Sequence, residues 1–464
     1  MCSPHSLFSR FPNTPKPNPS SPVFSPFFNQ FQTQTQTPSP ECHYDRATSL
    51  ATQLESRADP SELAQIHTHV LRHHLLLAPF HWNALMRSYL RHARPLHALL
   101  LFAQMSSSGA TPDSYSIPIA LKAASQTFSL AAGRQLHSAA VKLGLEFNEF
   151  CESGFINIYA KTGDFESALK MFDQNPQRKL GSWNAIISGL AQGGHLAEAI
   201  DMFLELRRAG LLPDDVTMVS VASACGGLGD LNLAQQVHKC VLQAQNLGRV
   251  DVMVCNSLVD MYSKCGRTDM AYQVFLRVPQ KNVATWTAMI MGLATHGKVG
   301  PALELFKAMR EQGAKPNRVT MVGVLCACAH GARIEEGMRY LNSMAREWGV
   351  EPTVAHYGCV VDMLGKVGRL AEARAVVERM PVAANAVVWG TLLGASEKHG
   401  DAEVGEWAAG KLLELEPWND GVYVVLSNIY AGKGMWGEVE RLRRLMRERS
   451  VAKTPGYSLA ATSA

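Results

Sequence analysis

One pattern recurs three times along this sequence, and this repetition restricts the possible folds more than any other feature. It occupies residues 80–113, 181–214 and 284–317. In each copy a Trp precedes a small polar residue and an apolar run, and a turn, a second apolar run and a closing Pro-Asp or Pro-Asn follow. A chain with a fixed internal period grows one unit at a time instead of around a single central core.

The three copies belong to a longer period. Alignment of Asn83, Asn184 and Thr287 gives spacings of 101 and 103 residues, and each interval holds three units. Their lengths cycle as 35, 35, 31, then 35, 37, 31, then 35, 36, 32, so that every third unit is short. We therefore expect nine units, with the boundaries 79–113, 114–148, 149–179, 180–214, 215–251, 252–282, 283–317, 318–353 and 354–385.

Each unit is expected to form two helices. In unit 180–214 the apolar residues of 183–190 and of 196–204 recur at helical spacing, and a Gly-Gly turn separates them. Gly210 and Pro213 are placed to end the second helix. Because neither helix covers its apolar face alone, the sequence predicts an all-α protein, a right-handed α-solenoid superhelix of stacked helix-turn-helix repeats. Its curvature would leave a concave groove along the first helices.

The composition agrees with a packed protein and restricts its partners. The chain of 464 residues is 47% hydrophobic, and its formal net charge of +4 permits an anionic partner without requiring one. No run of 18 apolar residues occurs, so we expect no membrane span and no membrane partner. The ten cysteines are scattered, which favours a reducing compartment in which Cys fills apolar space.

The N-terminal segment differs from the repeats. The first 40 residues contain nine prolines and seven serines, with Arg10 and Lys16 and no Asp or Glu. Such a composition does not bury a core, and an acid-free, Ser-rich N-terminus is typical of an organelle transit peptide. We therefore interpret 1–46 as a disordered transit peptide. Its prolines disfavour a long amphipathic helix, so the residues alone do not separate mitochondrion from plastid.

Two polar positions in each unit are candidates for binding. Asn184 is the fifth residue of its unit and Asp214 is the last, and stacking should bring both to the same groove. Asp214 is also a suitable N-cap for the following helix, so capping is an alternative role for it. Capping does not explain why the fifth residue is Asn in two copies and Thr in the third. The pattern therefore favours base recognition in single-stranded RNA.

These features resemble the plant pentatricopeptide repeat proteins of the P-L-S class, E subgroup. "NSLVDMYSKCGRTDMAYQVF" is similar to their short S unit, and "HYGCVVDMLGKVGRLAEARAVVERMP" to the last S unit. The segment after it, beginning "VVWGTLLGASEKHGDAEVGEWAAGKLLELEPWNDGVYVVLSNIY", resembles the E extension. The resemblance implies nine repeats over 79–385, a degenerate repeat over 47–78, an E extension of two degenerate helical repeats over 386–458, and a tail over 459–464.

The resemblance also implies which residues read RNA. The pairs Asn83/Asp113 and Asn184/Asp214 would read U, Thr287/Asn317 would read A, and Asn256/Asn282 would read C or U. The remaining pairs depart from the well-read combinations and receive no base: Pro118/Asn148, Ser153/Lys179, Val219/Asp251, Val322/Thr353 and Gly358/Asn385. The predicted target, from 5′ to 3′, is U-n-n-U-n-Y-A-n-n.

The residues needed for editing chemistry are absent from the sequence. Zinc deaminases need His-x-Glu and Cys-x-x-Cys, and neither motif occurs; Cys326 and Cys328 are predicted to lie on different faces of one helix. We expect no catalytic residue, no metal and no cofactor, and so a protein that is not an enzyme.

The resemblance implies that the chain directs C-to-U editing of organellar RNA. Its E region would recruit a deaminase-bearing pentatricopeptide repeat protein and editing accessory factors in trans. The resemblance also favours the mitochondrion as the compartment, with the plastid as the alternative. Two other functions remain open: stabilisation, splicing or processing of an organellar transcript, and a tetratricopeptide-like scaffold for proteins. The cycling unit lengths argue against the scaffold.

Overall fold

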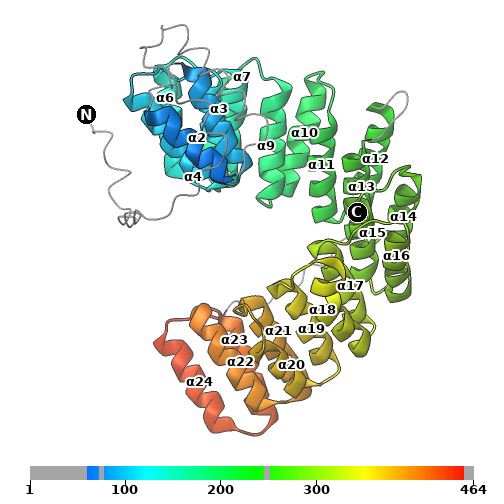
Figure 1. Ribbon diagram of the computed structural model, residues 1–464. Coiled ribbons are helices and arrows are strands. Elements are labelled where there is room, and N and C mark those ends of the chain that lie inside the picture. Colours follow the sequence, from blue (N-terminus) through cyan, green and yellow to red (C-terminus); the bar gives the residue numbers. More distant parts are fainter. Residues whose placement is uncertain (1–59, 73–77, 245–250, 454–464) are drawn as a thin grey trace, which may run out of the picture.

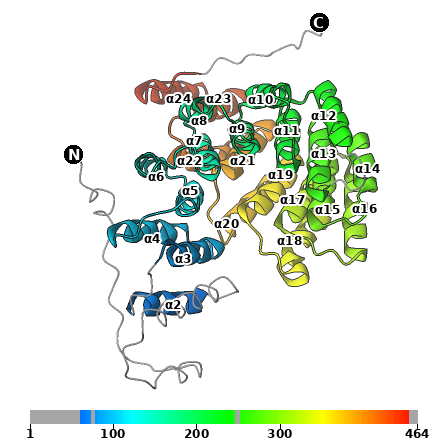
Figure 2. The ribbon, with the colours of Figure 1, turned by 90° about the horizontal axis from the view of Figure 1, so that it is seen from above.

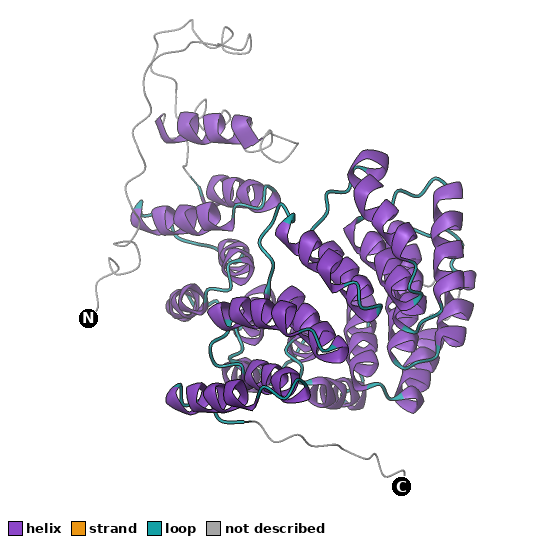
Figure 3. Ribbon diagram, turned by 90° about the horizontal axis from the view of Figure 1, so that it is seen from below, coloured by secondary structure: helices purple, strands orange, loops and turns teal. Residues whose placement is uncertain are grey.

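The described part of the chain is built from helices alone. The computed structural model describes residues 60–72, 78–244 and 251–453, and these contain 23 helices, labelled α2 to α24, with no strand among them (Figures 1 and 3). The predicted transit peptide (1–46), part of 47–78 and the tail (459–464) lie outside the described residues. None of the described helices is long and apolar enough to cross a membrane.

Every unit predicted from the sequence contains a first and a second helix. The first helices are α3 (Pro79–Arg91), α5 (Ser116–Gln126), α7 (Glu149–Lys161), α9 (Leu180–Gln192), α11 (Asp215–Leu228), α13 (Val252–Lys264), α15 (Val283–Thr295), α17 (Arg318–His330) and α19 (Val354–Lys366). The second helices are α4 (Pro95–Ser107), α6 (Leu130–Lys142), α8 (Phe165–Gln174), α10 (Leu196–Arg208), α12 (Leu231–Ala244), α14 (Thr268–Arg277), α16 (Val299–Glu311), α18 (Ile334–Trp348) and α20 (Leu370–Glu378).

Helices also precede and follow these nine units. α2 (Pro60–Arg72) comes before α3, and α21 (Ala386–His399), α22 (Ala402–Leu415), α23 (Asp420–Gly432) and α24 (Trp436–Glu448) continue the array through the predicted E extension. Figure 1 shows the helices arranged as an arc whose two ends, α2–α7 and α21–α24, lie on the same side. Figure 2 shows the same array from above. The predicted α-solenoid is confirmed.

The cycle of unit lengths has a structural origin in the second helices. In the short units these helices have 10, 10 and 9 residues (α8, α14 and α20), whereas α4, α10 and α16 have 13 each. The first helices of the short units keep 13 residues. The short units are therefore short in their second helices, whereas their first helices are as long as those of the 35-residue units that begin with α3, α9 and α15.

The first helices pack on one another from unit to unit and form the inner layer of the arc (Figure 1). The in-phase residues Trp82, Trp183, Trp286 and Trp389 are buried, as their helical phase predicts. Trp183 and Trp286 lie edge-on against Phe172 of α8 and Phe275 of α14, so they pack between the first and second helices. Gly210, which follows the C-cap residue Ala209 of α10, has φ = 78°. This left-handed conformation favours glycine and confirms the role of Gly210 in ending that helix.

The same inter-unit contacts recur along the array. His137 Nδ1 lies 2.8 Å from the Tyr159 hydroxyl, joining the second helix of one unit to the first helix of the next. His238 and Tyr262 repeat this contact at 2.9 Å, and His67 on α2 and Tyr89 repeat it at 2.7 Å. α2 thus meets α3 as the second helix of a unit meets its successor.

Small residues allow the first helices to approach closely. A methyl group on Gly189 of α9 would lie 2.3 Å from Cβ of Ala160 on α7, and one on Gly292 of α15 would lie 2.1 Å from Oγ of Ser263 on α13. Both distances are far below van der Waals contact, so glycine is required for this spacing.

We predict that Gly189→Ala destabilises the protein although alanine favours helices. The added methyl group must push α7 and α9 apart, so the free energy of unfolding measured in urea should fall by about 1–3 kcal/mol. Gly410→Ala is the matched control, because Gly410 lies in α22 with no atom within 4 Å of the added methyl group. This control should be stabilising by up to about 1 kcal/mol through helix propensity. Equal effects of the two substitutions would contradict the packing argument.

Candidate nucleic-acid interface

The predicted reading residues occupy places between adjacent first helices. We call the fifth residue of a unit its early residue, the last residue its closing residue, and the two together a slot. The early residue Asn184 lies in α9, and the closing residue Asp214 is the N-cap of α11. Since α9 and α11 are neighbours in the inner layer, residues 30 positions apart in sequence meet there.

The slot of Asn184 and Asp214 is well formed and open. Asn184 Nδ2 donates at 3.0 Å to both carboxylate oxygens of Asp214. Asn184 is half-buried and Asp214 is exposed, so polar groups of both residues face a position that a ligand can reach.

The other predicted slots differ in geometry. Asn83 Nδ2 donates to Asp113 Oδ1 at 3.1 Å, but Asn83 is only 2% exposed. Asn256 Nδ2 lies 3.4 Å from Asn282 Oδ1, and Asn256 is half-buried.

The slot of Thr287 and Asn317 is joined through a third residue. The Thr287 hydroxyl lies 2.7 Å from the hydroxyl of Thr320, which in turn lies 3.0 Å from Asn317 Oδ1. The structure therefore brings three predicted pairs into direct contact and links the fourth through this bridge.

The closing residues also cap the next first helix. Asp214 Oδ1 accepts the Thr217 backbone N–H at 2.8 Å, and Asn282 and Asn317 accept the corresponding N–H groups of Thr285 and Thr320, each at 2.9 Å. Capping and direct pairing, which the sequence presented as alternatives, therefore occur together in Asp214 and Asn282. Capping holds the closing residue in place while its remaining polar atoms face the slot.

A hydroxyl that was not predicted from the sequence lies beside each predicted slot. Ser116, Thr217, Thr285 and Thr320 each stand three residues after a closing residue, and each hydroxyl lies within 3.0 Å of the closing residue's Oδ1. The signal was present, because Asp-x-x-Ser, Asp-x-x-Thr and Asn-x-x-Thr are spacings that capping hydrogen bonds use.

A row of exposed apolar residues was also missed. Each lies at the second position of a first helix or of its unit, beside the slots, and is 43–70% exposed: Phe80, Tyr115, Phe150, Val216, Met253, Val319 and Val387. Large apolar side chains exposed in register along one layer suggest a ligand with flat apolar faces. In the sequence these residues stand next to the buried apolar residues of the same helix. Periodicity alone therefore did not show that they are exposed.

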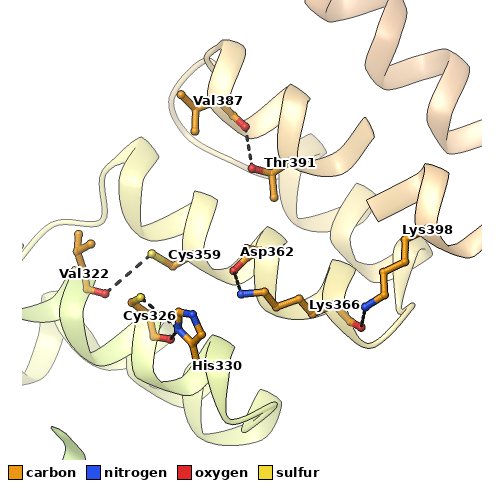
Figure 4. A network of polar contacts seen from close by, with 9 residues as sticks. All are labelled: Val322, Cys326, His330, Cys359, Asp362, Lys366, Val387, Thr391 and Lys398. Atoms are coloured by element: carbon orange, nitrogen blue, oxygen red, sulfur yellow. Dashed lines mark hydrogen bonds and ion pairs between the residues drawn. The ribbon is translucent and has the colours of Figure 1, made fainter. Parts of the chain in front are cut away.

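Slots without an assigned base have other arrangements. Lys179 forms an ion pair with Glu149 at 2.7 Å, and the Ser153 hydroxyl donates to the Glu149 carbonyl, so Lys179 and Ser153 are not bonded to each other. Figure 4 shows a second case, in which the early residue Val322 offers only its backbone carbonyl, 3.9 Å from the thiol of Cys359.

Lysines end the first helices of the short units at Lys161, Lys264 and Lys366. Lys366 contacts Asp362 at 2.6 Å, and Nζ of Lys398 on α21 reaches the Lys366 carbonyl at 3.5 Å, so cationic side chains lie on neighbouring inner helices (Figure 4).

The cysteines are embedded in apolar packing. Cys328 is buried and Cys326 is only partly buried, so the two lie on different faces of α17 as predicted. Burial raises the pKa of the Cys328 thiol to about 12, which keeps it protonated at neutral pH. Within 60–72, 78–244 and 251–453, no group of three or more His, Cys, Asp or Glu side chains is arranged to hold a metal ion.

Family models match much of the array. The PPR repeat model matches residues 80–109, 153–174, 181–211, 253–283 and 355–383, the PPR repeat family model matches 281–330, and the E motif model matches 399–460.

Two curated relatives are similar over most of the chain. A pentatricopeptide repeat-containing protein of Arabidopsis thaliana, named as mitochondrial, is 51% identical over 434 residues, which cover 93% of each protein. A second mitochondrial member from Arabidopsis thaliana is 37% identical over 377 residues, covering 81% of this chain and 59% of its own length.

A solved structure has the same fold. The pentatricopeptide repeat protein PPR10 in complex with an 18-nt psaJ RNA element matches with a TM-score of 0.68 and 18% identity. The match covers 89% of this chain and 62% of that one.

We predict that the contribution of Asp113 to stability depends on pH. Burial raises the pKa of this carboxyl, but hydrogen bonds from Ser116, Asn83 and Tyr115 outweigh burial and lower the pKa below its usual value. The contribution is then complete above the unfolded-state pKa of about 4 and is lost as the pH falls through the lower folded-state pKa. The difference in unfolding free energy between wild type and Asp113→Asn, measured in urea, should therefore shrink only below about pH 4.

Ser116→Ala is the control for this prediction. It removes the hydroxyl that lies 2.8 Å from Asp113 Oδ1, so the folded-state pKa of Asp113 should move back toward its ordinary value and the pH dependence should weaken. A difference between wild type and Asp113→Asn that grows as the pH falls would contradict the predicted direction.

Proposed function

The chain belongs to the pentatricopeptide repeat family, and we propose that it binds single-stranded RNA in a sequence-specific manner inside an organelle. The observation that carries the proposal is the slot of Asn184 and Asp214, where an amide on α9 and the carboxylate that caps α11 meet at 3.0 Å on an accessible surface. The fold shared with RNA-bound PPR10 is consistent with this proposal.

The chemistry of this slot suits uracil. One N–H of Asn184 bonds to Asp214 and the other remains available to donate, while the carboxylate remains able to accept. The Watson–Crick edge of uracil has carbonyl acceptors beside the N3–H donor and complements that arrangement. Cytosine has an unprotonated N3 and would direct a lone pair at the carboxylate. Asn83/Asp113 have the same chemistry, although Asn83 is more deeply buried.

The remaining assignments complete a target pattern. Thr287/Asn317 read A and Asn256/Asn282 read C or U, so the proposed site is U-n-n-U-n-Y-A-n-n from 5′ to 3′. The exposed apolar row from Phe80 to Val387 would contact the flat faces of the bases. The lysines at the other end of the first helices would attract the phosphates.

The proposed role is site recognition for C-to-U editing, with a deaminase acting in trans. Residues 386–458, which overlap the matched E motif at 399–460, would recruit a deaminase-bearing pentatricopeptide repeat protein and editing accessory factors. The chain itself would bind without catalysing. Stabilisation, splicing or processing of a transcript is the alternative within RNA metabolism. A protein-binding scaffold is disfavoured because polar slots recur in register with the cycling units.

The proposed compartment is the mitochondrion, with the plastid as the alternative. The relative that is 51% identical is named as mitochondrial, and another Arabidopsis thaliana member, 37% identical, is named as chloroplastic/mitochondrial.

We predict that Asn184→Ser, with Asp214 kept, weakens binding at a single base. The shorter serine side chain loses the amide donor, so the affinity for RNA with U at the fourth position of the pattern should fall about 3- to 10-fold, the worth of one hydrogen bond. Fluorescence anisotropy with RNAs that differ only at this base would measure the change.

Asn232→Ser is the matched control, because Asn232 is exposed on the second helix α12, away from the slots. It should leave all affinities unchanged. Equal loss of binding by Asn184→Ser on every RNA would point to misfolding and contradict a base-reading role.

We predict that plants lacking this protein lose C-to-U conversion at one or more organellar sites. The target pattern should lie a few bases upstream of each affected C, and sequencing of organellar RNA against wild type would identify these sites. Shortened or unspliced transcripts with unchanged editing would instead support the alternative role in RNA metabolism.

A further inference from the structure

A third side chain enters two of the slots. Thr217 is the third residue of α11 and is fully buried. Its Oγ1 lies 2.5 Å from Oδ1 of the early residue Asn184 and 2.9 Å from Oδ1 of the closing residue Asp214. Thr217 therefore contacts both members of the slot, not only the residue that caps its helix.

Thr320 occupies the same place in α17. Its hydroxyl lies 2.7 Å from that of the early residue Thr287 and 3.0 Å from Oδ1 of the closing residue Asn317. Two first helices, in different triplets of the array, thus present the same buried hydroxyl to an early residue.

This contact is not an automatic result of capping. Ser116 and Thr285 likewise stand three residues after a closing residue, and their hydroxyls donate to the closing residues Asp113 and Asn282 at 2.8 and 3.0 Å. The early residues beside them, Asn83 and Asn256, each keep a buried Oδ1 without a hydrogen-bond partner. Of the four slots with an assigned base, two therefore have the bridging contact and two lack it.

In the slot of Asn184 the bridge and the Asp214 carboxylate together determine which way the amide faces. Thr217 donates to Oδ1, and Asp214 accepts from Nδ2, so both ends of the amide are engaged. Rotation of the amide by 180° would break both bonds and turn Oδ1 toward the carboxylate. The bridged amide consequently offers a ligand its free N–H donor, which suits a carbonyl of uracil rather than the amino group of cytosine.

In the slot of Thr287 the bridge determines where a proton points. When Thr320 donates to Asn317 Oδ1, it accepts the proton of Thr287, and Thr287 then has only acceptor capacity for a ligand. An acceptor at this place suits the N6 amino group of adenine.

We propose that Thr217 and Thr320 are specificity-determining positioning residues, which fix the hydrogen-bonding character of the early residue and thereby the base that it reads. This inference rests on the proposed RNA-binding function and adds a third position to two of its slots. Neither hydroxyl needs to touch RNA, because both act through the early residue.

The test is Thr217→Val in the full chain, compared with wild type by selection from a random single-stranded RNA pool. Valine keeps the branched shape and removes the hydroxyl, so the Asn184 amide loses the contact to its Oδ1 and is held only through Nδ2. The preference for U over C at the fourth position of the enriched pattern should fall about 3- to 10-fold. The preferences at the positions read by Asn256 and Thr287 should remain as in wild type.

Two further variants separate positioning from stability. Thr217→Ser keeps the hydroxyl and should restore the preference for U. Thr285→Val is the matched control, because it removes a hydroxyl from the same place in α15 that contacts only the closing residue. It should leave the preference at the position read by Asn256 unchanged. If Thr217→Val fails to fold in thermal unfolding, Thr320→Val gives the same test through the preference for A.

The outcomes distinguish this inference from the proposed function. If wild type enriches the pattern and Thr217→Val enriches it with an unchanged preference for U over C, the positioning role is wrong while RNA reading stands. If wild type enriches no sequence, both are wrong. A fall in preference that is confined to the fourth position and reversed by Thr217→Ser supports the inference.

Discussion

The structure depends on the close packing of each first helix against the first helices of the neighbouring units. No central core exists in the described array, so these contacts supply burial and also set the spacing of the slots. Gly189 against Ala160 and Gly292 against Ser263 leave no room for another methyl group. A loosened interface would therefore separate the early and closing residues that meet across it. The stability of the array and the geometry of its slots therefore depend on the same spacing between neighbouring first helices.

The second constraint is the start of each first helix. Backbone N–H groups there need acceptors, and Asp214, Asn282 and Asn317 supply them. Hydrogen bonds from these N–H groups hold the closing side chain in one orientation. The early residue therefore contacts a side chain whose position is fixed. An array of such units presents polar groups in register along its inner surface, which suits a ligand that is itself a linear repeat.

Much of this architecture could be predicted because it depends on periodicity. The helical spacing of the apolar run that begins at Trp183 predicted the burial of this residue. The stacking of repeated units predicted that Asn184 and Asp214 lie together, although 30 residues separate them in the sequence. The bridging roles of Thr217 and Thr320 could not be predicted, because side-chain orientation decides whether a hydroxyl reaches the early residue. The exposure of Met253 could not be predicted either. An apolar residue next to the buried apolar residues of a helix is expected to be buried with them.

The closing residue both caps a helix and faces the slot. These two roles together limit how such a chain changes its target during evolution. Replacing an early residue such as Asn184 alters the contact with a base and leaves the helix starts intact. Replacing a closing residue such as Asp214 must preserve a short acceptor side chain or leave a helix uncapped, as at Lys179, where α9 starts without a side-chain cap. New specificities should therefore arise more readily by substitution of the early residue. The closing residue is restricted to the few side chains that cap a helix.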